Sequence, residues 1–264
     1  MMRKYWVLFS VCWQNGLVYK TSFVLWQLRQ LLATMLPLAL WTAVYATNTT
    51  AFGYSRGDMI GYIIGTGLLQ SIIMATGLHE IPRTVYSGEL SIILIRPLGI
   101  FRFALMLDLA DKLKNILIVV SVSVFLWLVL QPAVPSFNWS ALPLLGGWIL
   151  GGVVLHFFIE MLFGAIGFWS PDVWGPKFVF FVLVELAAGR SFPLDILPEA
   201  VQRVLFFTPF PLLGFVQAQL ALGRLPPERL TTITLGIISW CIALGLFCWA
   251  VWRHGLKSYA AAGR

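Results

Sequence analysis

Long hydrophobic segments alternate with short polar ones along the whole chain, and most approach the length that crosses a lipid bilayer. A helix of about 20 apolar residues spans the hydrocarbon core. Six segments fit this pattern: residues 22–46, 59–78, 113–131, 141–169, 176–191 and 230–252. The pattern predicts an all-α polytopic membrane protein with six transmembrane helices in a single transmembrane domain over residues 1–264.

The aromatic-rich stretch 3–20 precedes the first span and is flanked by basic residues. Such a segment is typical of an interfacial helix that lies in the headgroup plane. A cleaved signal peptide or a further span is the alternative, but no small-residue cleavage site follows the apolar run. We therefore expect an N-terminal interfacial helix.

Residues 193–229 are apolar but are interrupted by prolines and a glycine. Non-helical backbone is tolerated at membrane depth only where protein or a water-filled cavity surrounds it. This segment therefore predicts broken, re-entrant helices on the external side before the sixth span. A continuous span over 201–222 is the rival interpretation, and it would place the basic C-terminal tail outside.

The distribution of lysine and arginine orients these segments, because cytoplasmic loops carry an excess of both. The predicted arrangement places twelve of the 18 inside: Arg3, Lys4, Lys20, Arg83, Arg96, Arg102, Lys112, Lys114, Lys177, Arg253, Lys257 and Arg264. It places five outside: Arg56, Arg190, Arg203, Arg224 and Arg229. Both termini are then cytoplasmic, and we expect an integral protein of a bacterial cytoplasmic (inner) membrane.

Composition excludes a sizeable soluble domain. The chain is 59% hydrophobic and 11% charged, whereas soluble domains carry about a quarter charged residues. The net charge of +7 comes from basic residues at span ends, which indicates contacts with anionic membrane lipid and not with nucleic acid.

The chain shows no catalytic motif and no metal-ligand pattern, and its three histidines are scattered. It also lacks the glycine-rich phosphate loop that would cradle ATP. We expect neither an enzyme nor a cofactor in this chain, and any dependence on ATP and magnesium must come from a partner.

Four ionisable residues fall within or near the predicted spans. His156 and Glu160 are four positions apart and therefore share a helix face, Glu185 lies inside the fifth span, and Arg190 lies near its outer end. Ionisable groups at this depth are costly unless they are partnered. They are candidates for a translocation path, and for His156 and Glu160 a purely structural buried pair is the alternative.

The longest charged interruption is the segment 80–104 between the second and third spans. Apolar residues alternate there with charges, Gly88 interrupts the run and Pro97 ends it, so two short cytoplasmic helices along the membrane face are predicted. From composition alone, an ordinary basic loop that sets topology is the alternative.

The same segment reads E-x-x-R-x-x-x-S-G-E-L and then L-x-R-P-L, which resembles the loop after the second span in type-2 ATP-binding-cassette (ABC) exporter permeases. In that family this loop couples the permease to its ATPase. The resemblance assigns the coupling role to Glu80, Arg83, Ser87, Gly88, Glu89, Leu90, Arg96 and Pro97. The span pattern and the tail Gly255 to Tyr259 extend the resemblance over nearly the whole chain.

The resemblance implies the transmembrane permease subunit of an ATP-driven exporter that works by alternating access. Its implied partners are a pair of separate ATP-binding subunits and a second permease, in a homodimer or a heterodimer. The aromatic content of 15% favours an amphipathic or hydrophobic substrate. The alternative is a stand-alone secondary transporter or channel that uses His156, Glu160 and Glu185 as an ion or proton relay.

Overall fold

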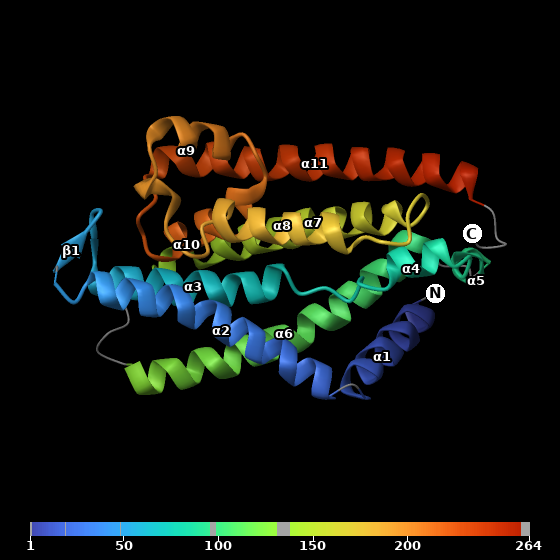
Figure 1. The fold of residues 1–264 in the computed structure, drawn as a ribbon, viewed down its shortest axis with the longest axis horizontal. Helices are drawn as coiled ribbons and strands as arrows, with labels where there is room; N and C mark the ends of the chain where they lie inside the picture. The colour runs from blue at the N-terminus through green and yellow to red at the C-terminus, as the bar shows by residue number, and fades with distance from the viewer. Residues whose placement is uncertain (1, 19, 48, 96–98, 131–137, 260–264) are drawn as a thin grey trace.

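The computed structural model of the chain describes residues 2–18, 20–47, 49–95, 99–130 and 138–259. Long helices lie side by side along its longest axis (Figure 1). The described chain begins and ends at the same end of this bundle, next to two short helices (Figure 1). A hairpin and the short helices that precede the last long helix lie toward the other end (Figure 1).

The first half of the chain forms four long helices: α1 (Met2–Val18), α2 (Lys20–Val44), α3 (Arg56–Ile73) and α6 (Ile100–Leu130). Helix α1 packs on α6, and α2 packs on α3. A Cβ added at Gly67 of α3 would lie 2.8 Å from the hydroxyl oxygen of Thr34, so the small residue permits close approach of α2.

A small β-hairpin joins α2 to α3, which the sequence predicted only as a loop. Strands β1 (Thr50–Ala51) and β2 (Tyr54–Ser55) pair antiparallel. The turn residues Phe52 and Gly53 have φ angles of 53° and 77°. Two successive left-handed residues match the two-residue turn that suits the twist of a hairpin. Asp58 and Ser55 then form a capping box that begins α3.

The second half is built around α7 (Leu142–Ile166), which follows the 3₁₀ turn η2 (Trp139–Ala141). Helices α8 (Trp174–Ala187) and α11 (Pro227–Ser258) follow it in the chain. Helix α7 contacts α3, α4, α6, α10 and α11, so it is the centre of the bundle. Its glycines sit at these contacts: a Cβ at Gly151 would overlap Ile237 of α11.

Between α8 and α11 the chain forms four short elements: η3 (Leu194–Ile196), α9 (Glu199–Phe206), η4 (Phe210–Leu213) and α10 (Phe215–Ala221). No residue of α9 is buried, but six of the seven residues of α10 are. The buried amide of Gln217 donates to the main-chain oxygens of Trp148 and Leu212, at 3.2 and 2.7 Å. Helix α10 is thus inserted into the bundle and held there by hydrogen bonds to the backbone.

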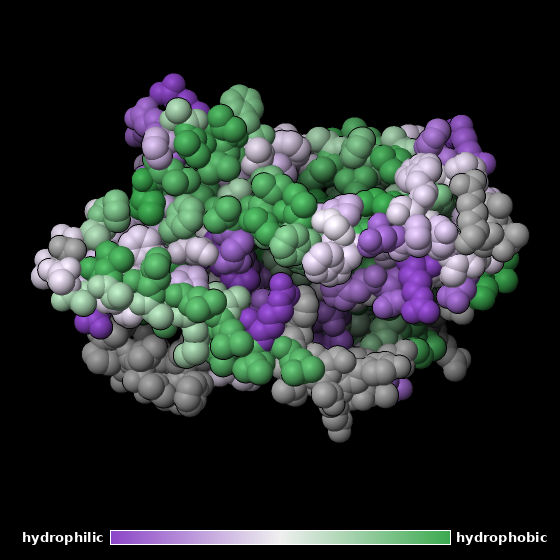
Figure 2. Space-filling model, in the orientation of Figure 1, coloured by the Kyte–Doolittle hydropathy of each residue, from purple (hydrophilic) through white to green (hydrophobic). Residues whose placement is uncertain are grey.

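The exterior of the bundle is apolar. On α11, Leu235, Ile242, Leu246 and Phe247 are each 58–63% exposed. Figure 2 shows hydrophobic surface over much of one face, with hydrophilic groups in its middle and near the end that carries the chain termini. Within the described residues, two helical segments are long and apolar enough to cross a membrane: Trp139–Ile166 and Pro227–Ser258. An all-helical membrane protein accounts for this surface, because so much exposed apolar area is unfavourable in water.

The helix bounds differ from the predicted spans most clearly on the two sides of segment 80–104. Helix α3 ends at Ile73, although the second span was expected to continue to residue 78. Helix α6 begins at Ile100, so the end of segment 80–104 belongs to a long helix. The end of α3 is capped by Lys112 of α6, and the start of α6 packs in an apolar cluster with α4 and α5, and a hydrophobic pattern contains neither contact.

Candidate functional site

Segment 80–104 begins with two short helices, α4 (Ile81–Tyr86) and α5 (Leu90–Leu94). Gly88 separates them and has a φ of 85°. Only glycine adopts this left-handed conformation without strain, so Gly88 fixes the turn between the helices. Arg96 and Pro97 of the predicted site lie outside the described residues.

The two helices present opposite faces. Ile81, Val85, Leu90 and Ile93 are between 0% and 7% exposed and belong to one apolar cluster with α6, α7 and α11. The other face carries the exposed polar residues Glu80, Arg83, Ser87 and Glu89. Glu80 and Arg83 lie 3.9 Å apart with side chains 78% and 84% exposed. Such a surface pair adds little stability, so both charges are available to another protein.

The backbone of α4 lies directly against the end of α7. A Cβ added at Gly167 would overlap the main-chain oxygen of Pro82, and one at Gly164 would lie 2.8 Å from Cγ2 of Ile81. The absence of side chains at these two positions brings the two helices into contact. Packed interiors are not continuously deformable, so a displacement of α4 must displace the end of α7 as well.

The end of α11 contacts α5, the second of the two short helices. The main-chain N–H of Ser91 donates to the hydroxyl of Tyr259 at 3.2 Å. The ring of Tyr259 meets Phe168 edge-on at 6.0 Å, and Phe168 meets Trp252 edge-on at 5.2 Å. The Trp252 indole N–H donates to the main-chain oxygen of Met161 at 2.8 Å. The rings of Phe168, Trp252 and Tyr259 therefore join the end of α11 to the end of α7, and the hydrogen bond from Ser91 attaches α5 to this aromatic cluster.

A buried lysine connects this region to the second predicted span. The Lys112 ammonium of α6 donates to the main-chain oxygens of Ile73, at 3.1 Å, and Ala75. It also lies 3.3 Å from the carboxylate of Asp108, and both side chains are at most 4% exposed. Carbonyl groups at a helix C-terminus lack intrahelical partners and carry partial negative charge. Lys112 therefore caps the end of α3, where the chain leaves the helix toward α4.

The structure brings His156 and Glu160 together with a third residue. Nε2 of His156 lies 3.8 Å from the Glu160 carboxylate, and the other oxygen of that carboxylate lies 2.8 Å from Lys177 Nζ. Lys177 follows α7 in the chain and had been expected only as a topology signal. It supplies the charge that makes a buried Glu160 tolerable.

Glu185 and Arg190 form a separate group. Glu185 lies 3.6 Å from Arg190 and accepts a hydrogen bond from the Ser191 hydroxyl at 2.8 Å. Arg190 also lies 3.5 Å from the side-chain oxygen of Gln30 on α2. Among the described residues, no hydrogen bond or ion pair joins this group to His156 or Glu160. The four candidates thus form two clusters within this chain, and their part in a translocation path stays a prediction.

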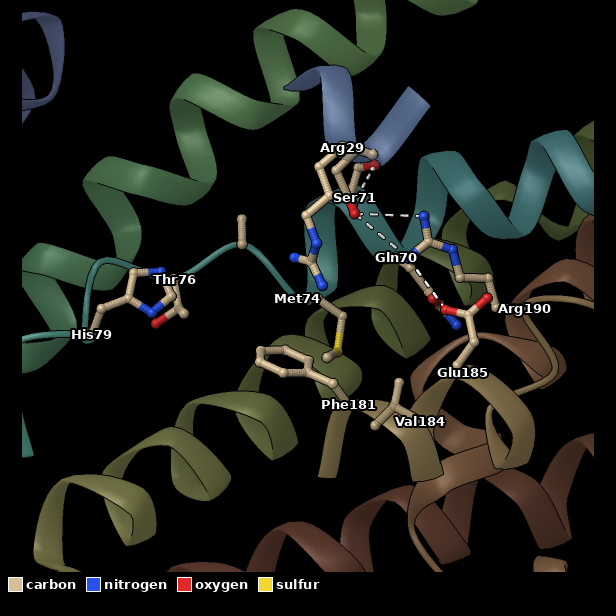
Figure 3. Close-up of a pocket in the computed structure, with 12 residues that line it drawn as sticks. Arg29, Gln70, Ser71, Met74, Thr76, His79, Phe181, Val184, Glu185 and Arg190 are labelled. Carbon is tan, nitrogen blue, oxygen red and sulfur yellow. Dashed lines mark hydrogen bonds and ion pairs between the residues drawn. The ribbon is translucent and has the colours of Figure 1, made fainter. Parts of the chain in front are cut away.

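The Glu185 group lines a cavity between α2, α3, α8 and the link from α3 to α4 (Figure 3). Its polar walls come from Arg29, Gln30, Gln70, Ser71, Thr76, His79, Glu185 and Arg190, and its apolar walls from Met74, Ala75, Phe181 and Val184. Sequence reasoning found Glu185 and Arg190 from their depth in a span. It missed the residues from α2 and α3, which join them only in the folded chain.

A helical bundle with an apolar exterior, a charged and exposed helix pair at one end and polar groups inside is typical of an integral membrane protein. The sequence profile described as ABC-2 family transporter protein matches residues 31–263. The chain belongs to this family and is a permease subunit of an ABC transporter, a class of permease that works with an ATP-binding subunit. A search of curated proteins finds no match.

Proposed function

We propose that this chain is the membrane-spanning subunit of an ATP-driven exporter, with six spans and both termini on the cytoplasmic side of a bacterial inner membrane. A pair of ATPase subunits docks on α4 and α5, and a second permease, identical or related, completes the translocation path. An amphipathic or hydrophobic substrate leaves the cytoplasm or the inner leaflet by alternating access.

The observation that carries this proposal is the two-faced character of the coupling helices. Glu80, Arg83, Ser87 and Glu89 are exposed together, whereas Leu90 on the opposite face is fully buried. A docking surface needs the first property, and transmission of force to the spans needs the second. A partner shifts a conformational equilibrium only by contacting its two states differently, and α4 and α5 are placed for such contacts.

The force would leave the coupling helices along three routes. Pro82 meets α7 at Gly167, Ser91 meets α11 through Tyr259, and the link after α3 is held to α6 by Lys112. At the opposite end, the inserted helix α10 packs on α3 and α7 and is suited to shape the external exit. Helix α7 therefore contacts both α4, at the proposed cytoplasmic end of the translocation path, and α10, at its proposed external end.

The test is purification of the chain from its native membrane in mild detergent, followed by identification of co-purifying proteins and an ATP hydrolysis assay. We expect to recover an ATPase with a phosphate-binding loop. Glu89→Lys reverses a charge on the exposed face, and Gly88→Pro forbids the φ of 85°. Both variants should insert into the membrane but uncouple ATP turnover from transport.

A charge reversal away from the coupling helices provides the control. Glu199→Lys on α9 changes an equally exposed carboxylate, 83% exposed, at the other end of the bundle and should leave ATPase recovery unchanged. Normal transport in both coupling variants would refute the coupling role. Recovery of the chain alone, with proton-driven flux in liposomes, would instead favour a stand-alone secondary transporter.

A further inference from the structure

The cavity between α2, α3 and α8 carries an excess of positive charge. Two arginines, Arg29 and Arg190, and one carboxylate, Glu185, line it. His79 also lines the cavity and adds positive charge only when it is protonated. Figure 2 shows hydrophilic groups gathered in the middle of the molecule, and Figure 1 places this region where α2 and α3 lie near α8.

The hydrogen bonds of the cavity are incomplete on the donor side. Nε of Arg190 and Nε2 of Gln70 are buried and have no hydrogen-bond partner in the described part of the chain. Gln70 is only 1% exposed. The remaining contacts of Arg190 are long, at 3.5 Å to Gln30 and 3.6 Å to Glu185. Buried donors without acceptors are unfavourable, so the cavity is chemically suited to a group that supplies acceptors.

The acceptors on the same walls are already satisfied. The oxygen of Gln30 faces Arg190, the hydroxyl of Ser71 accepts from the amide of Gln30 at 3.4 Å, and one Glu185 oxygen accepts from Ser191. The unpaired buried acceptors of the described residues belong to other sites, on Asp108, His156, Glu160, Gln217 and Gln219. The cavity therefore lacks hydrogen-bond acceptors, such as the oxygen atoms of an anion. It does not lack a donor or a cation.

Apolar side chains lie beside these donors. Cζ of Arg29 is 5.7 Å from the centre of the Phe181 ring, and Met74 and Val184 complete this side of the cavity (Figure 3). A guanidinium next to an aromatic and aliphatic wall suits a molecule that joins an anionic group to a hydrocarbon portion. A cationic amphiphile would meet two like charges here.

We propose that this cavity binds the anionic group of an amphipathic molecule, a phosphate, sulfate or carboxylate, with Arg190 and Gln70 as donors and Arg29 at the rim. The hydrocarbon portion lies against Phe181, Met74 and Val184. This inference rests on the proposed function and specifies its substrate class. The same chemistry also fits the headgroup of an anionic bilayer lipid, and the experiment separates the two sources.

The test measures binding of radiolabelled dodecyl phosphate to the purified full chain in nanodiscs of phosphatidylcholine. We expect saturable binding that neither dodecyltrimethylammonium nor dodecyl maltoside displaces. Arg190→Gln should weaken it by roughly 10-fold or more, because a hydrogen bond to a charged group is lost. Glu185→Gln should tighten it several-fold, because a like charge is removed while the size and shape of the side chain are kept.

Matched variants distinguish a loss of binding from a loss of folding. Arg203→Gln makes the same change on α9, where the side chain is 79% exposed, and should leave binding unchanged. If Arg190→Gln does not fold, the opposite effect of Glu185→Gln still tests the proposal. Equal binding in all three variants, or displacement of dodecyl phosphate by dodecyltrimethylammonium, would overturn it.

A final comparison identifies the source of the anion. Competition by phosphatidylglycerol in the nanodisc as strong as that by unlabelled dodecyl phosphate would assign the site to a bilayer lipid. Weak competition would favour a transported amphiphile. Because the assay needs no ATPase, failure of anion binding leaves the proposed exporter intact. Recovery of no ATPase, with binding retained, would refute the exporter and leave the site.

Discussion

Lys112 lies 3.1 Å from the main-chain oxygen of Ile73, a residue 39 positions earlier in the chain. The contact caps α3 inside the bundle, at the point where the chain leaves this helix toward α4. The ammonium thereby acts both as a helix cap and as the attachment to α6 of the link from α3 to α4. Its partner Asp108 keeps the charge neutral in a region from which water is excluded.

We expect Lys112→Met to destabilise the protein by about 3 kcal/mol, because removal of one partner leaves the Asp108 carboxylate buried and unpaired. The capped carbonyls of Ile73 and Ala75 lose their donor at the same time. Thermal unfolding of the purified permease in detergent measures the effect.

The double variant Asp108→Leu/Lys112→Met distinguishes charge from packing. Replacement of a whole buried ion pair by apolar residues is often close to neutral, so the double variant should be more stable than Lys112→Met alone. Lys114→Met serves as a control, because Lys114 pairs with the partly exposed Asp111 at 2.7 Å. Equal losses in the single and double variants would argue against a dominant role for the ion pair.

Gly167→Ala should reduce transport while the protein still inserts and folds. The new methyl group overlaps the main-chain oxygen of Pro82 and must push α4 away from α7. Transport in proteoliposomes and ATPase stimulation are the readouts. Gly146→Ala on the same helix adds a methyl group with no atom within 4 Å and should leave both unchanged. Identical behaviour of the two variants would contradict a close backbone contact.

Tyr259→Phe should loosen the coupling segment slightly, with a cost of at most about 1 kcal/mol, because one hydrogen bond is lost. The Ser91 N–H retains the oxygen of Gly88 at 3.2 Å, and the ring retains Phe168. Hydrogen exchange of peptides from residues 87–95 should become faster. Tyr259→Ala removes the ring contact as well and should accelerate exchange further, whereas no difference between the two would show that the ring contributes nothing.

Cysteine labelling tests the orientation of the bundle. In a chain whose native Cys12, Cys241 and Cys248 are replaced by serine, Thr50→Cys and Ser87→Cys place single thiols on exposed positions at opposite ends. A membrane-impermeant maleimide should label residue 50 in intact cells and residue 87 only after the membrane is opened. Labelling of residue 87 from outside would reverse the proposed topology.

The hydrophobic pattern places some helix bounds closely and others poorly, because it reads only local properties of a sequence: α6 begins at Ile100, although the third span was expected to begin at residue 113. Helix α2 over 20–44 lies within two residues of the expected 22–46, and α11 extends beyond 230–252 at both ends. The break at Gly88 was also a local signal. The hairpin turn was not, since Phe52 is not a residue that indicates left-handed backbone.

The side-chain partners of the candidate site depended on distant contacts, and the sequence alone did not contain them. Glu160 pairs with Lys177 across 17 positions, and Arg190 meets Gln30 across 160. The order of charges along the chain suggested instead that Lys177 only marks the cytoplasmic side. The relay alternative grouped Glu185 with His156 because both lie at membrane depth, and the partners of Glu185 in the structure are Ser191 and Arg190.

The contact between Tyr259 and Ser91 has a practical consequence for anyone who labels this protein. A reporter or purification tag fused behind Tyr259 through a short linker will stand beside the surface where the ATPase is expected to dock. Steric competition by the tag would then imitate an uncoupled variant. A long linker with a protease site removes this artefact, and cleavage of the tag before partner recovery is the appropriate control.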